Sequence, residues 1–560
     1  MLAGLVAVGP TATAAPTPDC AAPYPVADVV SGAPVTGLTV SKGTTPQPFT
    51  GEVLGVLSDG IAPGLDMIVA ELDSPAIDAA GGIWQGMSGS PVYAEDGRLI
   101  GAVAYGLAFG SSPVAGITPF EDMQGYLGAA KAAPEVAVSS RLATRIAAET
   151  DVTRSQAGQG LRQLPMPMGV GGIDLARART AVKAAGGSEL VTPDSYRIGR
   201  SSGTAAAGID TVVAGGNVAA VLSHGDITFA GIGTATSVCG NRVVAFGHPL
   251  NFTGKTRLGL AAADAVYVQE DPLGVPFKVA NLGNVGGTVT DDRLAGIAGT
   301  FGASPSATPV RSTVAHGSKS RTGTTQVLDP TALADVTLLA GMANHDRVVD
   351  GVGGGTETQA WTITGTRSGS PFRLRYADRY QSADDVGSAG AFDLPTVVGT
   401  LSSVSNVKLT GVTNEVRVSN FRERFRVVKI QQRTGGRWID VTGKTAKVRA
   451  GHTLALRTRL LGTDGATRTV FRQDFTIPKS LKGKSGVVTV VGGNSFQDEF
   501  SEPTSFDSVQ KMMQGNLRND ELELSLTIGS GRTAYERTRT SDVMTRVVNG
   551  QRDLQVRVTS

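Results

Sequence analysis

GGIWQGMSGSPVYAEDGRLIGAVAYG, residues Gly81 to Gly106, carries the clearest structural and chemical signal in this 560-residue chain. Ser88 lies near its centre, with Gly86 two residues before it and Gly89 directly after it. Glycines at these places let the backbone turn tightly. Such a turn directs the N–H groups of Gly86 and Ser88 toward one point, where they would stabilise a developing oxyanion. The pattern therefore predicts that Ser88 is a nucleophile.

The residues after this turn have the pattern of β-strands. Val92 and Tyr93 begin one strand, Glu-Asp-Gly at 95–97 is a turn, and Leu99 to Tyr105 is an apolar strand. The run from Leu99 to Ile117 has no charged residue, but its glycines and Pro113 favour two buried strands over a membrane span. This layout resembles the nucleophile region of chymotrypsin-like serine peptidases.

The five histidines of the chain are candidates for the general base that Ser88 needs. His248 ends the apolar strand VVAFGHP at 243–249, where a rigid base is wanted. The competing histidines are His224, which precedes a Gly-Asp turn, His316 and His345, whose polar neighbours predict solvation, and His452. We expect His248 to take the Ser88 proton and to return it to the leaving amine.

Several of these motifs together resemble the SpoIVB family of serine peptidases over about residues 36–310. They are TVSKGT at 39–44, GMSGSP at 86–91, GHP at 247–249, GTVTDDR at 287–293 and GIAGT at 296–300. The resemblance implies serine endopeptidase activity on a chymotrypsin-like double β-barrel. It also implies that the substrate is the enzyme itself or one regulatory protein. The founding member has its histidine before its serine, so the reverse order here predicts permuted halves.

The resemblance also suggests further site residues. The family places an acidic residue about 15 positions before its serine, which makes Asp73 the expected partner of the histidine, and Asp78, Asp264 and Asp292 are alternatives. By analogy with chymotrypsin-like enzymes, Ala104, Tyr105 and Gly106 would pair with an extended peptide substrate. The other interpretation of these three residues is an ordinary core strand.

The whole chain is expected to be mainly β, with a C-terminal β-sandwich and a small α/β tail after the two barrels. Composition shifts divide it into a signal-peptide remnant at 1–15, a serine-bearing barrel half at 36–130, a helical connector at 131–185, a histidine-bearing barrel half at 186–376, an immunoglobulin-like sandwich at 400–480 and an α/β segment at 481–560.

Composition excludes several functions. Lys and Arg number 51 against 49 Asp and Glu, without a basic run, so no nucleic-acid partner is expected. The only cysteines, Cys20 and Cys239, permit one disulfide, and no Cys or His cluster predicts a metal or cofactor. The apolar start followed by small residues indicates export, so we expect a secreted or cell-envelope protein without a stable membrane span.

The partner that these features predict is a protein or peptide substrate. Two other functions fit the same sequence. One is a catalytically silent envelope protein that uses the barrels and the sandwich for binding, and the other is an esterase with the same catalytic groups. Nothing in the sequence sets an oligomeric state.

Overall fold

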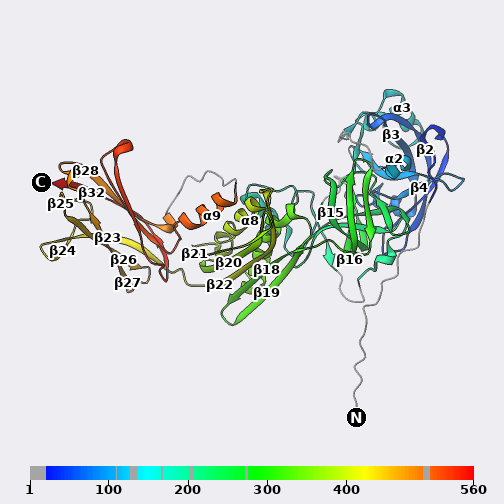
Figure 1. Ribbon diagram of the computed structural model, residues 1–560. Coiled ribbons are helices and arrows are strands. Elements are labelled where there is room, and N and C mark those ends of the chain that lie inside the picture. The colour runs from blue at the N-terminus through cyan, green and yellow to red at the C-terminus, as the bar shows by residue number, and fades with distance from the viewer. Residues whose placement is uncertain are drawn as a thin grey trace, which may run out of the picture. The chain divides into compact units, whose positions relative to one another are not determined.

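The computed structural model describes residues 21–108, 110–125, 135–164, 168–200, 206–271, 275–495 and 505–560. The predicted signal remnant at 1–15 and Cys20 lie outside these residues. Figure 1 shows a mainly β chain, as predicted. It divides into two compact units, the first formed by residues 1–307 with 325–332 and the second by 308–324 with 333–560.

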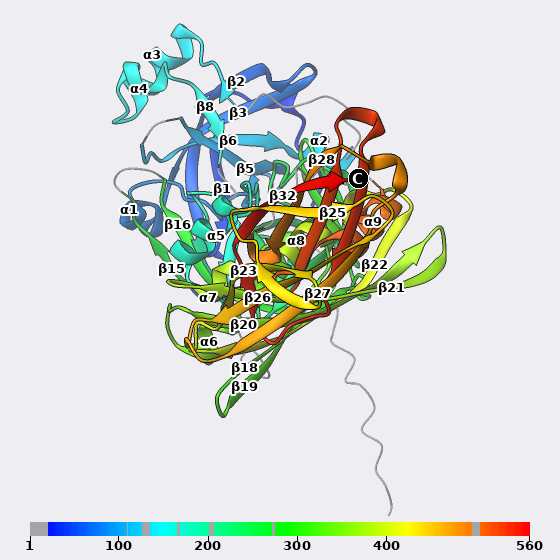
Figure 2. The same cartoon turned by 90° about the vertical axis from the view of Figure 1, so that its left-hand side faces the viewer.

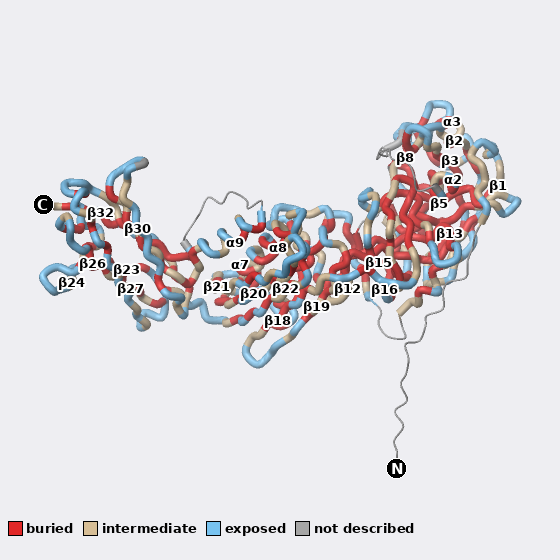
Figure 3. Tube along the Cα trace, in the orientation of Figure 1, coloured by how far each residue is buried: buried red, intermediate tan, exposed pale blue. Residues whose placement is uncertain are grey.

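The first unit begins with a six-stranded barrel that contains the Ser88 region. Its strands follow the order β4–β1–β2–β3–β6–β5, and β4 pairs with β5 to close it. They are β1 (Pro34–Thr39), β2 (Gln47–Ala62), β3 (Leu65–Asp73), β4 (Pro91–Tyr93), β5 (Leu99–Leu107) and β6 (Val114–Pro119). Every residue of β5 and β6 is buried, as the red tube in Figure 3 shows. The expectation that the uncharged run forms two buried strands is therefore confirmed.

Two short helices belong to this barrel, α1 (Pro75–Ala80) and α2 (Phe120–Gly125). The Ile77 N–H donates to the Ser74 hydroxyl at the start of α1, and Gly81 ends the helix with φ of 78°. This left-handed residue turns the chain directly into the segment that contains Ser88.

A connector joins the first barrel to the second. It contains β7 (Glu135–Val136), α3 (Ser140–Glu149), α4 (Arg154–Ala157), β8 (Leu161–Gln163), β9 (Gly169–Gly171), α5 (Leu175–Ala184), β10 (Tyr196–Arg197) and β11 (Gly199–Arg200). Figure 2 shows α3, α4 and β8 in cyan beside β2 and β3. Most important for the site, β8 pairs with β7 on one edge and with β5 of the barrel on the other.

The second barrel of this unit also has six strands. They are β12 (Asn217–Gly225), β13 (Thr228–Cys239), β14 (Arg242–Ala245), β15 (Gly254–Gln269), β16 (Phe277–Arg293) and β17 (Gly296–Phe301). Their order is β13–β14–β17–β16–β15–β12, and β12 pairs with β13 to close the barrel. The predicted double β-barrel is confirmed, and the barrel with the serine precedes the barrel with the histidine.

The second unit starts with a sheet that carries helices. The sheet contains β18 (Thr308–His316), β20 (Gly355–Arg367), β21 (Ser370–Ser382) and β22 (Val407–Ser419), and the helices are α6 (Leu333–Val349), α7 (Val386–Ala389) and α8 (Asp393–Ser403). The last three residues of β19 (Lys319–Val327) belong to the first unit, where they pair with β12.

A β-sandwich follows in the same unit, as predicted. One sheet contains β23 (Arg424–Thr434), β24 (Arg437–Asp440), β26 (Thr453–Gly462), β27 (Arg468–Thr476) and β31 (Val547–Asn549). The other contains β25 (Thr445–Arg449), β28 (Ser485–Gly492), β29 (Leu522–Ile528), β30 (Tyr535–Thr540) and β32 (Gln551–Thr559). Both sheets supply one buried core. The last residues, which the sequence assigns to a separate segment with α9 (Phe506–Gly515), thus complete the sandwich.

Candidate active site

The turn that carries Ser88 lies between α1 and β4 of the first barrel and packs against β13 of the second. Gly86 and Gly89 have φ of 94° and 99°. A Cβ on Gly89 would overlap the Thr234 carbonyl oxygen of β13, so the second barrel leaves room only for glycine here. The Thr234 N–H donates to the Ser88 carbonyl oxygen at 2.8 Å, and the Thr236 hydroxyl donates to the Gly89 carbonyl oxygen at 2.8 Å.

The structure brings Ser88 and His248 together although 160 residues separate them. His248 follows β14, after Phe246 and Gly247 with φ of 74° and 70°. The Thr118 hydroxyl of the first barrel donates to the Gly247 carbonyl oxygen at 2.6 Å, which fixes the approach of this segment. Ser88 Oγ lies 2.9 Å from His248 Nε2, and both residues are fully buried.

The second ring nitrogen of His248 identifies the tautomer. Nδ1 lies 2.8 Å from the Pro249 carbonyl oxygen, which accepts hydrogen bonds and cannot donate them. Nδ1 therefore carries the proton, and Nε2 is left to accept from the Ser88 hydroxyl. Burial lowers the pKa of His248 from 6.5 to about 4, against the opposing effect of the Pro249 carbonyl.

The prediction of Asp73 as the partner of the imidazole is corrected by this geometry. Asp73 is exposed at the end of β3, where it pairs with Thr50 of β2. The His248 Nδ1–H instead donates to the Pro249 carbonyl oxygen, and the Gln163 amide nitrogen, which lies 3.0 Å from Nδ1, donates to the same oxygen at 3.2 Å. At the spacing that the family suggests, this chain places Asp73, which is the exposed last residue of β3 on the surface of the first barrel.

Asp292, one of the alternatives, acts one step further from the histidine. It is fully buried in β16 and accepts from the N–H groups of Leu250 and Asn251 at 2.8 Å and of Thr253 at 3.2 Å. These bonds fix the loop that begins with Pro249, and so the carbonyl that orients the imidazole.

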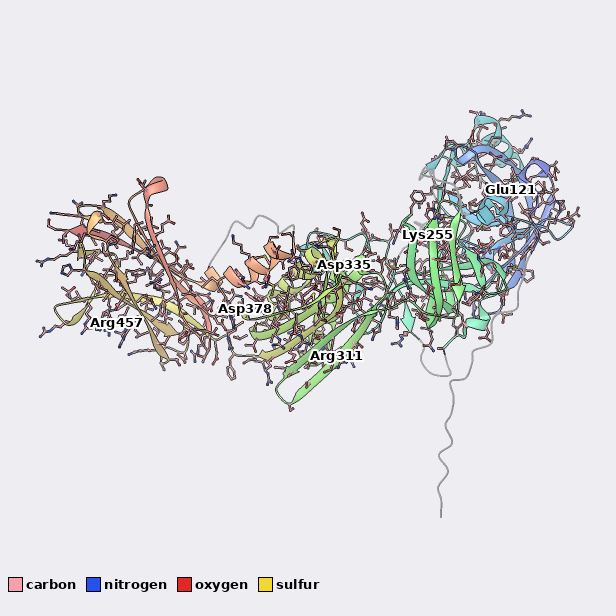
Figure 4. The ribbon with its side chains drawn as sticks, viewed as in Figure 1. Glu121, Lys255, Arg311, Asp335, Asp378 and Arg457 are labelled. Atoms are coloured by element: carbon pink, nitrogen blue, oxygen red, sulfur yellow. The ribbon has the colours of Figure 1, made fainter. Side chains whose placement is uncertain are left out.

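The carboxylate of Asp291, the residue before Asp292, has a different partner. Asp291 pairs with Lys255, which Figure 4 labels in the region of β15 and β16, at 2.9 Å. Of the remaining alternatives, Asp78 is exposed on α1 and Asp264 lies on β15, and neither is a described partner of His248.

The predicted oxyanion donors are the N–H groups of Gly86 and Ser88, two residues apart in the turn. Within the described residues, the N–H groups of Gly86 and Ser88 have no hydrogen-bond acceptor. The carbonyls of Gln85 and Gly86 both accept hydrogen bonds from Lys278. Lys278 donates through its backbone N–H to the Gln85 carbonyl at 3.0 Å and through Nζ to the Gly86 carbonyl at 2.9 Å.

Lys278 is a site residue that the sequence analysis missed. Its Nζ also donates to Asn217 Oδ1 at 2.8 Å, and the residue is 1% exposed. Burial lowers its pKa to about 7. The available signal was its position in β16, because Lys278 alternates in phase with the buried residues Ala280 and Leu282.

The predicted substrate edge, Ala104 to Gly106, is covered by a strand of the same chain. Tyr105 pairs with Gln163 and Gly106 with Arg162, antiparallel. The Leu164 N–H donates to the Ala104 carbonyl oxygen at 2.9 Å.

Among the other histidines, the expectation of a solvated His345 is wrong. It is 4% exposed in α6 of the second unit and lies 3.8 Å from a Glu357 carboxylate oxygen.

Cys239 is disulfide-bonded, while Cys20 lies outside the described residues. The described residues contain no group of acidic, His and Cys side chains suited to a metal ion, and no helix long and apolar enough to cross a membrane.

The buried imidazole predicts a pH-dependent stability. Between pH about 4 and 6.5 the unfolded chain binds a proton at His248 that the folded chain does not bind. The free energy of unfolding therefore falls as pH falls through this window, by up to about 1.4 kcal/mol per pH unit. Urea unfolding of wild type and of His248→Gln, which cannot titrate, measures the effect. A stability difference between them that is constant with pH would contradict the prediction.

Comparison with known proteins supports the resemblance drawn from the motifs. Residues 9–120 match the family model described as SpoIVB peptidase S55, which confirms the resemblance over this part of the chain. The match includes the Ser88 turn and ends before His248. Comparisons with curated proteins and with solved structures found no match.

Proposed function

We propose that this protein is an exported serine endopeptidase in which Ser88 is the nucleophile and His248 the general base. The observation that carries the proposal is the 2.9 Å contact from Ser88 Oγ to His248 Nε2, in the tautomer that accepts the hydroxyl proton. The N–H groups of Gly86 and Ser88, which have no acceptor among the described residues, and the peptidase family match at 9–120 support it.

The reaction follows from these positions. Ser88 Oγ attacks the carbonyl carbon of the substrate while His248 Nε2 takes its proton. The oxyanion that forms accepts from the N–H groups of Gly86 and Ser88. His248 then gives the proton to the leaving amine, and a water molecule attacks the acyl-enzyme with the same base.

The imidazolium formed in this reaction is stabilised by a backbone carbonyl and not by a carboxylate. His248 Nδ1 donates to Pro249 oxygen, whose loop is fixed by Asp292. A carbonyl dipole stabilises a neighbouring positive charge less than a full negative charge does. Asp292 is thus a positioning residue, one hydrogen-bonded segment away from the ring.

The proposed setting is extracytoplasmic, secreted or in the cell envelope. It rests on the apolar N-terminal sequence with its small residues and on the disulfide at Cys239. The proposed substrate is a protein or peptide, either this chain or one regulatory protein. No nucleic acid or cofactor is needed for the chemistry described.

Covalent labelling with a fluorophosphonate probe tests the proposal. Wild type is expected to be labelled at Ser88, and Ser88→Ala is expected to remain unlabelled while folding normally by circular dichroism. Hydrolysis of peptide and ester substrates, compared in the same preparation, separates an endopeptidase from an esterase. Folded wild type that takes no label and cuts no peptide would favour the silent binding protein.

A further inference from the structure

The strand β8 lies where a peptide substrate of the proposed enzyme would lie. Peptides bind to an exposed strand edge by adding a strand to the sheet. The edge of β5 from Ala104 to Leu107 is the one beside Ser88, and β8 pairs with it antiparallel through residues Leu161 to Gln163. The Leu164 N–H extends the pairing to the Ala104 carbonyl at 2.9 Å, and the Ala108 N–H to the Gly160 carbonyl at 3.2 Å.

The direction of β8 also agrees with that of an acyl donor. Its carboxyl end reaches the catalytic pair, because the Gln163 amide contacts His248 Nδ1 at 3.0 Å and the Pro249 carbonyl oxygen at 3.2 Å. A substrate must present its residues before the scissile bond in this direction, so that the last carbonyl meets the serine.

Leu164, next along the chain, fills an apolar pocket beside the Ser88 turn. Its side chain is 1% exposed and belongs to the same buried cluster as Ile83, Trp84 and Met87. A Cβ on Gly106 would lie 3.0 Å from Leu164 Cδ2 and 3.3 Å from Ile83 Cδ1. The leucine therefore lies between the Ser88 loop and β5, and glycine at 106 leaves the room for it.

We propose that β8 with Leu164 is a tethered occupant of the substrate cleft, and that the pocket of Leu164 selects an aliphatic residue of its size directly before the scissile bond. The inference rests on the proposed peptidase function and adds its substrate class. It also accounts for the complete burial of Ser88 and His248, which a substrate must reach. Cleavage of another chain then requires that β8 leave the edge of β5.

The short length of β8 keeps the free-energy cost of its departure from β5 small. It has three residues, and in the described part of the chain its outer edge pairs with the two residues of β7. A strand of this length is stable mainly through the side chains that it and its flanks bury. These are Leu161 and Leu164, and Leu164 is the one in the cluster beside the Ser88 turn. Leu164→Ala should therefore favour the open cleft without removing any group that touches the reacting atoms.

The first experiment measures the rate at which fluorophosphonate labels Ser88 in the full chain. We expect Leu164→Ala to be labelled on the order of tenfold or more faster than wild type, since removing the buried leucine side chain raises the open fraction. The matched control is Leu190→Ala, which truncates another buried leucine of this unit, in the segment after α5, and should keep the wild-type rate. Thermal unfolding confirms that each variant is folded.

A second experiment does not depend on catalysis. The peptide QGLRQL, which copies residues 159–164, is titrated by calorimetry into the full chain carrying Ser88→Ala and Leu164→Ala. We expect it to bind at least about tenfold more tightly than QGLRQD, in which a charge would enter the apolar pocket.

The outcomes separate this inference from the proposed function. Equal labelling of wild type and Leu164→Ala, with no preference for QGLRQL over QGLRQD, overturns the inference even where Ser88 reacts normally. Selective binding of QGLRQL by a chain whose Ser88 is never labelled supports the cleft and its pocket while it contradicts the peptidase.

Discussion

Replacing Ser88 and His248 by alanine, singly and together, is expected to lower kcat for peptide hydrolysis by nearly the same large factor, on the order of 10⁶. The two side chains work as one unit, because the 2.9 Å contact transfers the proton that activates the hydroxyl. Once either is lost, the other has no function in the chemical step, so the double variant loses little more than each single variant.

The comparison should be made both in wild type and in the Leu164→Ala background, where the cleft is expected to be accessible. Ser41→Ala and His316→Ala, which remove the same residue types away from the catalytic pair, are the controls and should keep the parental kcat. Losses that multiply in the double variant, or a residual rate above about 1% in Ser88→Ala, would show that the two residues do not form a catalytic unit.

The parts of the site that could be predicted are those with a local signature. A tight turn that exposes two N–H groups requires glycines at fixed offsets from a serine, and this requirement is visible as GMSGSP. His248 could be identified because it ends an apolar strand, and five histidines leave few alternatives. The strand patterns were likewise sufficient for a mainly β chain and a C-terminal sandwich, since alternation and turn residues indicate burial. The double barrel was implied by the family resemblance.

The group that orients His248 could not be predicted, because it is a backbone carbonyl and not an acidic side chain, and every residue has a backbone carbonyl. The Pro249 carbonyl orients His248, and a backbone carbonyl leaves no mark in a sequence. Asp292 contributes only through the N–H groups of the loop it holds, and its own neighbour Asp291 has the same residue type but pairs with Lys255. Only the strand register of β16 decides which of the two points inward.

The covering strand had no signature either. Leu161 to Gln163 is too short for alternation to be measured and lies between helices of a connector. Its pairing with β5 connects residues more than 50 positions apart, and such long-range pairing depends on the whole barrel. The C-terminal strands of the sandwich were assigned to a separate segment for the same reason, because β25 and β32 pair across about 100 residues.

Lys278→Met is expected to lower kcat by about 10²–10³ and to change KM little, which is the loss seen when one oxyanion donor is removed. Lys278 holds the Gly86 carbonyl through Nζ, while its backbone N–H, retained in the variant, holds the Gln85 carbonyl. Without Nζ, only the Thr234 hydroxyl at 3.0 Å restrains the Gly86 carbonyl. The Gly86 carbonyl shares a peptide unit with the Met87 N–H, between the two oxyanion donors. Loss of Nζ therefore loosens the turn at this peptide and alters the spacing of the N–H groups of Gly86 and Ser88.

This effect on catalysis should be separable from an effect on stability. Methionine fills a similar volume and removes a buried amine, but it leaves Asn217 Oδ1 without its donor, at a cost of about 1–3 kcal/mol. Removal of a buried charge offsets part of that cost, so the urea midpoint should move little. A peptide boronic acid, which binds as an oxyanion, should lose affinity in parallel with kcat, whereas QGLRQL should bind unchanged when measured in the Ser88→Ala, Leu164→Ala background. Equal losses for both ligands would mean that Lys278 supports the cleft as a whole and has no specific effect on the two N–H groups.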